Sequence, residues 1–245
     1  MTRAAQSLRN PLARALLALT FTTGLVDAVS YLGLGRVFTA NMTGNVVFLG
    51  FGIAGTGGLP VVAPLISLGA FLVGAGAGGV LARRMGDRQR EHIARALAIE
   101  VALLAVAAVI AAAVAVRPNA LSGDTVIALM ALAMGVRNAT VRRIGIPDLT
   151  TTVLTMTLTA LAAESPLAGA SGTGSLRRVA AVLAMFAGAL AGALLLKASL
   201  VLPLVAAAAL AAITWLVYIP AARARGRSAP QGVRQRAAPG PTTTA

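Results

Sequence analysis

The chain of 245 residues is 58% hydrophobic and only 11% charged, whereas a water-facing surface needs about a quarter of its residues charged, so an ordinary soluble domain is excluded. The formal net charge of +14 would suggest a nucleic-acid partner in a soluble protein, but here the basic residues cluster between apolar runs and in the two tails, where such charge sets membrane topology. We therefore expect an all-α, polytopic membrane protein whose main partner is the lipid bilayer and which binds no nucleic acid.

Long apolar runs predict six membrane-spanning helices, because a helix needs about 20 apolar residues to cross a bilayer. The first predicted span is interrupted only by Asp27. The third is interrupted only by Glu100, which lies near an Arg-rich end and is expected to snorkel toward water. In chain order the predicted spans are residues 15–35, 59–82, 96–116, 120–141, 179–196 and 198–222.

Two further segments, residues 38–53 and 149–163, are short and rich in Thr, Asn and Gly. They are too short and too polar to cross a membrane alone, so we expect them to form re-entrant or broken helices. The two tails, residues 1–11 and 223–245, are rich in Arg, Pro, Gly and Thr. We expect both tails to be disordered, because they can bury little apolar surface.

The distribution of arginine and lysine favours six spans over eight. If both short segments cross, the basic residues divide into 11 on the side of the N-terminus and 10 on the other side. If both segments dip into the membrane and return, the division is 18 against three, and the three are Arg36, Arg117 and Lys197. Short cytoplasmic loops carry an excess of basic residues, so we expect six spans in a bacterial inner membrane, with both termini cytoplasmic.

The order of features repeats along the chain. Each half contains a spanning helix, a short polar segment, a Gly-rich spanning helix and another spanning helix, and Gly24 in the first half aligns with Gly135 in the second. Three crossings per half is an odd number, which would turn the second half upside down relative to the first. We therefore predict two inverted membrane repeats, at residues 12–116 and 117–222.

A motif in the first half points to a known family. It is the run Phe38-Thr39-Ala40-Asn41-Met42-Thr43-Gly44-Asn45, which follows Asp27. This run resembles the signature of the YoaK family of bacterial integral membrane proteins, and the resemblance extends over about residues 12–220. The chain has Thr155-Met156-Thr157 where the family's second motif often carries Thr-Gly-Thr. The resemblance implies a membrane protein but supplies no substrate.

Asp27 is the strongest candidate for a functional residue, because an ionised carboxylate inside a membrane span costs about 3 kcal/mol. Thr23 and Ser30 recur with it at helical spacing and form a polar stripe that would face the interior of the bundle. Asp27 is then either a proton or cation site, or a structural acid that caps broken backbone near residues 33–35 or pairs with Arg137. The sequence leaves these alternatives open.

Hydroxyl and amide side chains recur at helical spacing in both short segments. They would either line a pathway for an uncharged or weakly charged solute or satisfy interrupted backbone. We favour a lined cavity, because two re-entrant segments from opposite faces should meet near the midplane. The predicted ion or substrate pathway consists of Asp27, Thr39, Asn41, Thr43, Asn45, Asn138, Thr151 and Thr155.

Glycines spaced four residues apart predict close helix packing, either within one chain or between copies in a homo-oligomer. The predicted packing pairs are Gly74 with Gly78 and Gly188 with Gly192. Outside these motifs, we expect Arg137 to snorkel to the cytoplasmic face and His92, in an Arg-rich stretch, to be solvated.

The chain offers one histidine, no cysteine and scattered carboxylates, which make no recognisable catalytic set. We therefore expect no enzyme activity, no cofactor and no metal site. The leading hypothesis is a small-solute transporter or channel-like permease with a polar site at the midplane. The alternative is a non-transporting membrane scaffold or regulatory partner, which a dry and filled centre would favour.

Overall fold

The computed structural model describes residues 11–86, 88–144, 154–165, 169 and 174–227, and within these ranges every regular element is a helix, as predicted. The π-helical segment η1 continues α2 directly. In chain order the elements are α2 (Pro11–Ala28), η1 (Val29–Gly33), α3 (Met42–Ile53), α4 (Val62–Met85), α5 (Gln89–Ala113), α6 (Leu121–Ile144), α7 (Leu154–Ala163), α8 (Ser175–Leu196) and α9 (Val201–Arg227).

Five of the described helical stretches are long and apolar enough to cross a membrane, and they overlap the first five predicted spans. They are Leu12–Gly33, Val62–Met85, Gln89–Ala113, Leu121–Ile144 and Ser175–Leu196. The sixth predicted span forms α9, whose apolar part is described over the shorter stretch Val201–Val217. The chain is therefore a multi-pass helical membrane protein.

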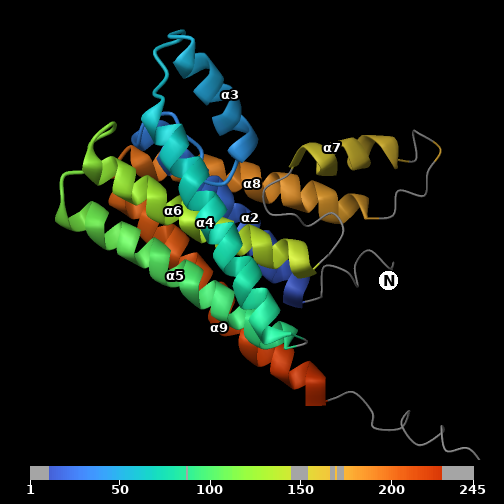
Figure 1. Cartoon of the computed structure of the whole chain (residues 1–245). Coiled ribbons are helices and arrows are strands. Elements are labelled where there is room, and N and C mark those ends of the chain that lie inside the picture. The colour runs from blue at the N-terminus through green and yellow to red at the C-terminus, as the bar shows by residue number, and fades with distance from the viewer. Residues whose placement is uncertain (1–10, 87, 145–153, 166–168, 170–173, 228–245) are drawn as a thin grey trace, which may run out of the picture.

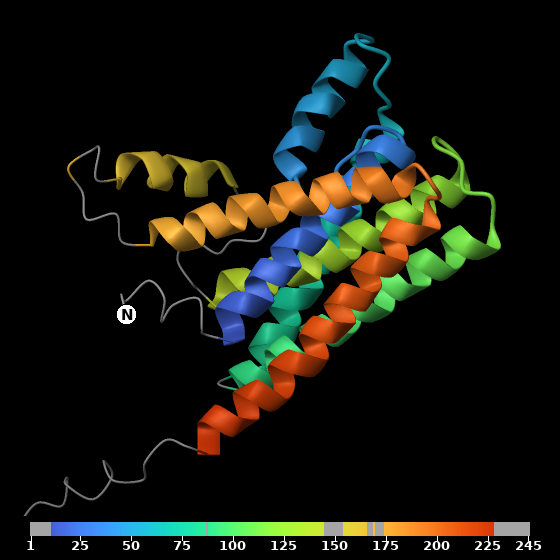
Figure 2. The ribbon, with the colours of Figure 1, turned by 180° about the vertical axis from the view of Figure 1, so that it is seen from behind.

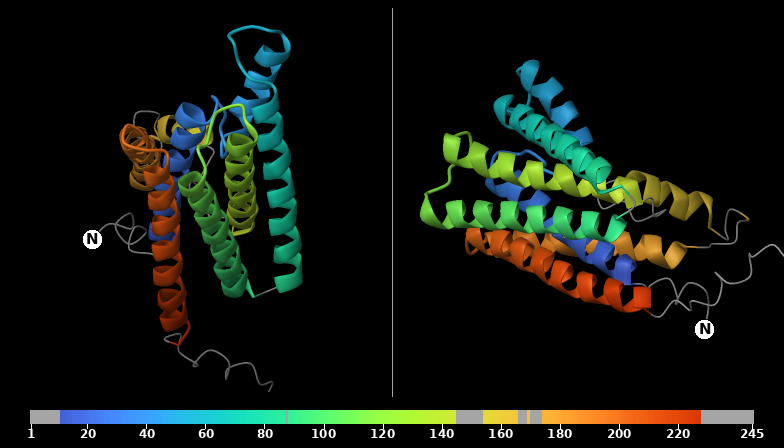
Figure 3. Two further views of the ribbon diagram at one scale, coloured as in Figure 1. Left: turned by 90° about the vertical axis from the view of Figure 1, so that its left-hand side faces the viewer. Right: turned by 60° about the horizontal axis from the view of Figure 1, so that its bottom comes forward.

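The closest helix pairs join the first half of the chain to the second. α2 packs against α8, α4 packs against α6, and α5 lies beside α9, while α3 rests on α4 and α7 on α8 (Figure 1). Seen from behind, α8 crosses over α2 next to α9 (Figure 2). The left view of Figure 3 shows α5 and α6 between α4 and α9. The halves are thus interleaved and do not form two separate lobes.

Glycines permit the two closest pairs. Gly188 lies against the backbone of Phe21 in α2, and Gly74 lies against the backbone of Leu132 in α6. One turn further along, an added methyl group at Gly78 would lie 2.9 Å from the Cβ of Ala139. At Gly192 it would lie 2.8 Å from the Cβ of Ala28, closer than real Cβ contacts allow. All four predicted packing glycines therefore join helices within one chain.

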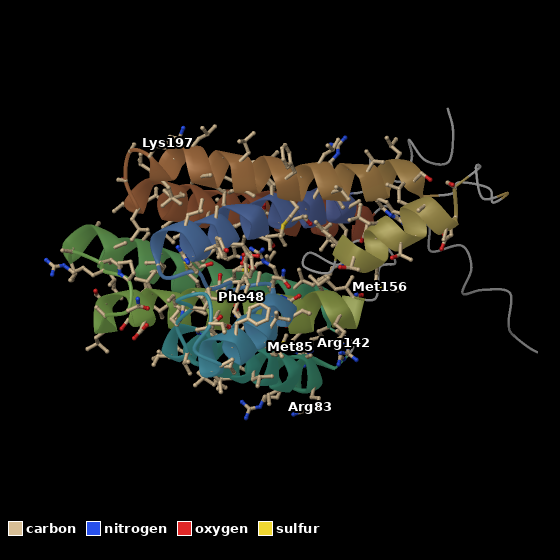
Figure 4. The ribbon with its side chains drawn as sticks, turned by 90° about the horizontal axis from the view of Figure 1, so that it is seen from above. Phe48, Arg83, Met85, Arg142, Met156 and Lys197 are labelled. Atoms are coloured by element: carbon tan, nitrogen blue, oxygen red, sulfur yellow. The ribbon has the colours of Figure 1, made fainter. Side chains whose placement is uncertain are left out.

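Basic residues lie at both ends of the bundle. At one end, Leu12, Ile93 and Ile144 pack together, which brings the starts of α2 and α5 beside the end of α6. Arg83 and Arg142 lie toward this end, opposite Lys197 (Figure 4). At the other end, Gly33 meets Leu196 and Leu200, so η1 ends beside the connection between α8 and α9.

The first short segment enters the bundle and returns to the end at which it began. From η1 the chain turns back, so that Thr39 and Ala40 reach the level of Asp27 before α3 starts. After α3, Gly58 and Pro60 line the same cavity as Gly35 in the preceding loop. α3 has 12 residues and is about 18 Å long, well below the about 30 Å of a hydrocarbon core, so it is too short to cross a membrane alone.

The second short segment forms α7. From its first turn, α7 runs toward the end of the bundle at which α2 begins, opposite to the end from which the first short segment enters. The first turn of α7 lies near Asn138, at the middle of the molecule. Its far end is held by Arg178 of α8, which donates a hydrogen bond to the carbonyl oxygen of Ala160 and forms an ion pair with Glu164. α8 in turn begins near the start of α2, because Ala181 packs with Ala13.

Candidate functional site

Asp27 is almost fully buried, and one carboxylate oxygen holds the non-helical backbone before α3. It accepts hydrogen bonds from the backbone N–H groups of Thr39, at 3.1 Å, and Ala40, at 2.9 Å. Irregular backbone at membrane depth must find such partners, because lipid offers none. Of the roles considered for Asp27, the geometry is that of a backbone cap, placed at residues 39 and 40 and not at residues 33–35.

Asn45 fixes the same turn from the other side. Its side-chain oxygen accepts the N–H of Phe38 at 2.8 Å, and its amide nitrogen donates to the Phe38 carbonyl at 2.6 Å and to the Ser67 hydroxyl at 3.1 Å. Ser67 of α4 also donates to the Phe38 carbonyl, at 2.6 Å. Asn45 and Ser67 are fully buried, so the polar groups of the Asn45 side chain bond to the protein itself.

A cavity of about 540 Å³ lies where the first turns of the two short helices meet. Its polar side chains come from both halves of the chain, and apolar and aromatic side chains from α3, α4, α7 and α8 complete its wall. None of the described residues that line it is charged. The lining consists of Ala40, Asn41, Met42, Thr43, Gly44, Val47, Phe48, Phe71, Asn138, Leu154, Thr155 and Met185.

The predicted pathway residues divide between the cavity and the layer behind it. Four of them, Asn41, Thr43, Asn138 and Thr155, line the cavity. Asp27, Thr39 and Asn45 are buried behind it, and the Thr39 hydroxyl has no hydrogen-bond partner among the described residues. Thr151 lies outside the described residues.

A second polar cluster, which was not predicted from the sequence, lies in the bundle. Both Arg137 and Glu100 are buried and form an ion pair through two guanidinium nitrogens. Arg137 also donates to the Leu19 carbonyl and to the Thr23 hydroxyl, each at 2.8 Å. The expectations that Arg137 and Glu100 snorkel are therefore wrong, because each side chain satisfies the other inside the bundle.

His92 is also placed differently from the expectation. It lies on α5 and is 1% exposed, so it is buried and not solvated. The sequence contained a signal for the second polar cluster, since Glu100 and Arg137 are opposite charges inside predicted spans. The described residues contain no group of three or more acidic, His or Cys side chains that could hold a metal ion.

Comparison with known proteins assigns the chain to a family. The family described as "Protein of unknown function (DUF1275)" matches residues 15–217, so the chain belongs to it. The chain is also 36% identical, over 148 residues, to the UPF0700 transmembrane protein YoaK of Bacillus subtilis (strain 168). That match covers 58% of this chain and 62% of the relative's length, so it spans less than two thirds of that protein. No solved structure matches.

Proposed function

We propose that this member of the DUF1275 family is a small-solute transporter or channel-like permease. The observation that carries the proposal is the cavity of about 540 Å³ at the meeting point of α3 and α7. Pockets of about 300 to 1,000 Å³ are of the size that binds small molecules in proteins.

The chemistry of the lining favours a small polar solute without a strong charge. Asn41, Thr43 and Thr155 offer hydroxyl and amide groups that both donate and accept hydrogen bonds. Asn138 adds an amide whose nitrogen donates to the Met134 carbonyl at 2.8 Å, and Phe48 lies in the same wall. No acidic or basic side chain is among the described lining residues, so a solute with a full charge would meet no counter-charge there.

We further propose that the two halves are inverted repeats, as in many secondary transporters. The support is that contacts recur when each half is exchanged for the other: α2 with α8 matches α6 with α4, and α3 with α4 matches α7 with α8. The matched glycine contacts are Gly24 with Gly188, Gly135 with Gly74, Gly192 with Ala28 and Gly78 with Ala139.

The proposed setting is a bacterial inner membrane with both termini in the cytoplasm. Arg36, Arg117 and Lys197 are the only basic residues assigned to the opposite face in the six-span topology. The excess of basic residues on the side of the termini supports this orientation. The proposal includes no catalytic step and no cofactor.

The test is solute flux through purified protein in liposomes. Swelling rates would be recorded by stopped-flow light scattering in glycerol, urea, ribose, alanine and sodium acetate. We expect at least one of these solutes to enter faster than it enters protein-free liposomes. In Asn138→Leu the rate for that solute should fall roughly tenfold, because a polar group that faces the solute is replaced by an apolar one.

Thr125→Val is the matched control. The Thr125 hydroxyl bonds to the Leu121 carbonyl of its own helix at 2.7 Å, and the residue does not line the cavity. Its flux should equal that of the unmodified chain. The proposal fails if no probe enters faster than in protein-free liposomes, or if Asn138→Leu leaves every rate unchanged.

One observation favours the second candidate, a non-transporting scaffold or regulatory partner. The side chains of Asp27 and Asn45 form their hydrogen bonds with the backbone of residues 38–40. They therefore need no solute to account for their presence. The swelling assay separates the two candidates, because a scaffold would move none of the probes.

A further inference from the structure

A second cavity lies at the end of the bundle that carries Arg36. It is an open cavity of about 620 Å³, and residues of three loops line it, among them Arg36, Gly58 and Asn119. Tyr31, near the end of η1, also lines it. The re-entry of the first short segment creates this cavity, because Gly58 returns to the level of Arg36.

Three aromatic rings lie between this second cavity and the cavity of about 540 Å³ at the meeting point of α3 and α7, which we call the midplane cavity. Tyr31 lines the second cavity, Phe48 lines the midplane cavity, and Phe38 stacks on both. The Phe38 ring centroid is 5.1 Å from that of Tyr31, with an interplanar angle of 18°, and 5.7 Å from that of Phe48, with an angle of 21°. Tyr31 and Phe48 are themselves 6.0 Å apart, so the three rings form one closed cluster.

The middle ring is clamped in place. Asn45 and Ser67 hold both backbone polar groups of Phe38, as described above. The ring also lies against Gly44, where an added methyl group would be 2.8 Å from Phe38 Cδ2. Gly44 is itself part of the midplane cavity wall, so Phe38 closes that wall from behind.

We infer that Tyr31, Phe38 and Phe48 form an aromatic gate that separates the midplane cavity from the second cavity and controls entry to it. This inference rests on the proposed function, since it assumes that the midplane cavity is part of a pathway. An apolar constriction blocks water and polar solutes because they would have to give up their hydration to pass it. The second cavity is then the vestibule on that face, and Asn45 is a positioning residue that holds the gate through the Phe38 backbone.

The chain contains no cysteine, so a single introduced thiol reports access without background. The experiment places a cysteine in the midplane cavity, as Thr43→Cys, in the full-length chain in membrane vesicles. A charged, membrane-impermeant methanethiosulfonate reagent is applied only from the face of the Gly55–Gly58 loop, and the modification rate is measured. Combining Phe38→Ala with this cysteine should raise the rate about tenfold, because two aromatic contacts and the plug itself are lost.

Two controls make the result specific. Phe71→Ala also removes an aromatic ring from the midplane cavity wall, but Phe71 is not part of the stacked cluster, so the Thr43→Cys rate should stay unchanged. A cysteine at Leu32, which lines the second cavity, should react at the same rate with and without Phe38→Ala.

If Phe38→Ala lowers the yield of folded protein, Tyr31→Ala is the alternative variant. It removes the ring that lines the second cavity without affecting the hydrogen bonds between Asn45 and the Phe38 backbone, and the same increase in the Thr43→Cys rate is expected.

The gate is refuted if Thr43→Cys reacts equally fast from that face with Phe38 in place and with it removed, or if Phe71→Ala opens access to the same extent. Failure of the permease proposal looks different, because it appears as absent swelling in every probe. The labelling assay needs no substrate. A raised rate of labelling without solute flux would therefore retain the gate and reject the transport role.

Discussion

At the scale of single residues, the polar groups in the membrane part serve mainly the protein's own backbone and charges. Asp27 accepts two backbone amides, and Arg137 pairs with Glu100 while bonding to α2. A lone charge in lipid is costly, so each one is matched by a partner that the sequence places far away. Asp27 fixes the conformation of the turn before α3, and Arg137 fixes the contact of α6 with α2 and α5.

The first prediction concerns Asp27. In Asp27→Ala, the buried amides of Thr39 and Ala40 lose their acceptor, which should destabilise the fold by about 1–3 kcal/mol for each unsatisfied group. Asp27→Asn keeps an acceptor oxygen of similar shape and should lose clearly less. Thermal unfolding in detergent compares the two variants. Equal losses would mean that the charge, and not the cap, is what the site requires.

The second prediction concerns the buried ion pair. Arg137→Met leaves Glu100 charged, buried and unpaired, which should cost about 3–5 kcal/mol. The double variant Glu100→Met with Arg137→Met removes both charges and should recover most of that loss, because similar apolar groups fill the space. A double-mutant cycle on unfolding measures the coupling. Additive losses would contradict the pairing.

The sequence indicates which residues are unusual at this scale but not what they contact. Asp27, Glu100 and Arg137 stand out because they interrupt apolar runs. Pairing Arg137 with Glu100 requires the relative rotation and depth of α5 and α6, which depend on contacts between distant parts of the chain. A prediction made for one helix at a time therefore places Arg137 and Glu100 toward water, whereas both lie inside the bundle.

At the scale of elements, the spans follow from apolar length, whereas their ends follow from local polar chemistry. α3 begins at Met42 and not at Phe38, because residues 38–41 are held in a non-helical turn by Asp27 and Asn45. The glycine spacing predicts close packing, but the spacing is the same for a partner within the chain or in another copy. Only the crossed arrangement of α2, α4, α6 and α8 identifies the partners.

The third prediction tests this close packing. Gly74→Ala places a methyl group against the backbone of Leu132 and should destabilise the fold by about 1–3 kcal/mol, the usual cost of overpacking. Gly76→Ala is the control on the same helix, because nothing lies within 4 Å of its added Cβ. It should be neutral or slightly stabilising, since alanine favours helix. Thermal unfolding of the two variants in one detergent measures the difference, and equal effects would contradict the packing.

At the scale of the whole molecule, the two short helices determine which loops share a face. Because α3 returns to its starting end, the loop at Gly57 should lie on the same side of the membrane as Asn119, and opposite Gly86. The distribution of basic residues in the sequence predicts the same arrangement.

The fourth prediction follows from this topology. Single cysteines at Gly57, Asn119 and Gly86, each introduced into the cysteine-free chain, would be labelled with an impermeant maleimide on intact cells and on inverted vesicles. Gly57→Cys and Asn119→Cys should react from one face and Gly86→Cys from the other. If Gly57→Cys instead reacts together with Gly86→Cys, α3 crosses the membrane and the six-span topology is wrong.

The interleaving of the helices has a consequence for how the protein is made. α2 leaves the ribosome early, yet the helix that covers its glycine-notched side begins only at Ser175. Until α8 has been synthesised, the side of α2 that contains Gly24 has no helix to pack against. The same holds for the Gly74 side of α4 until α6 has been synthesised. The contacts of α2 with α8 and of α5 with α9 can thus form only in the last third of translation, and a chain truncated before α8 would leave α2 without its main packing partner.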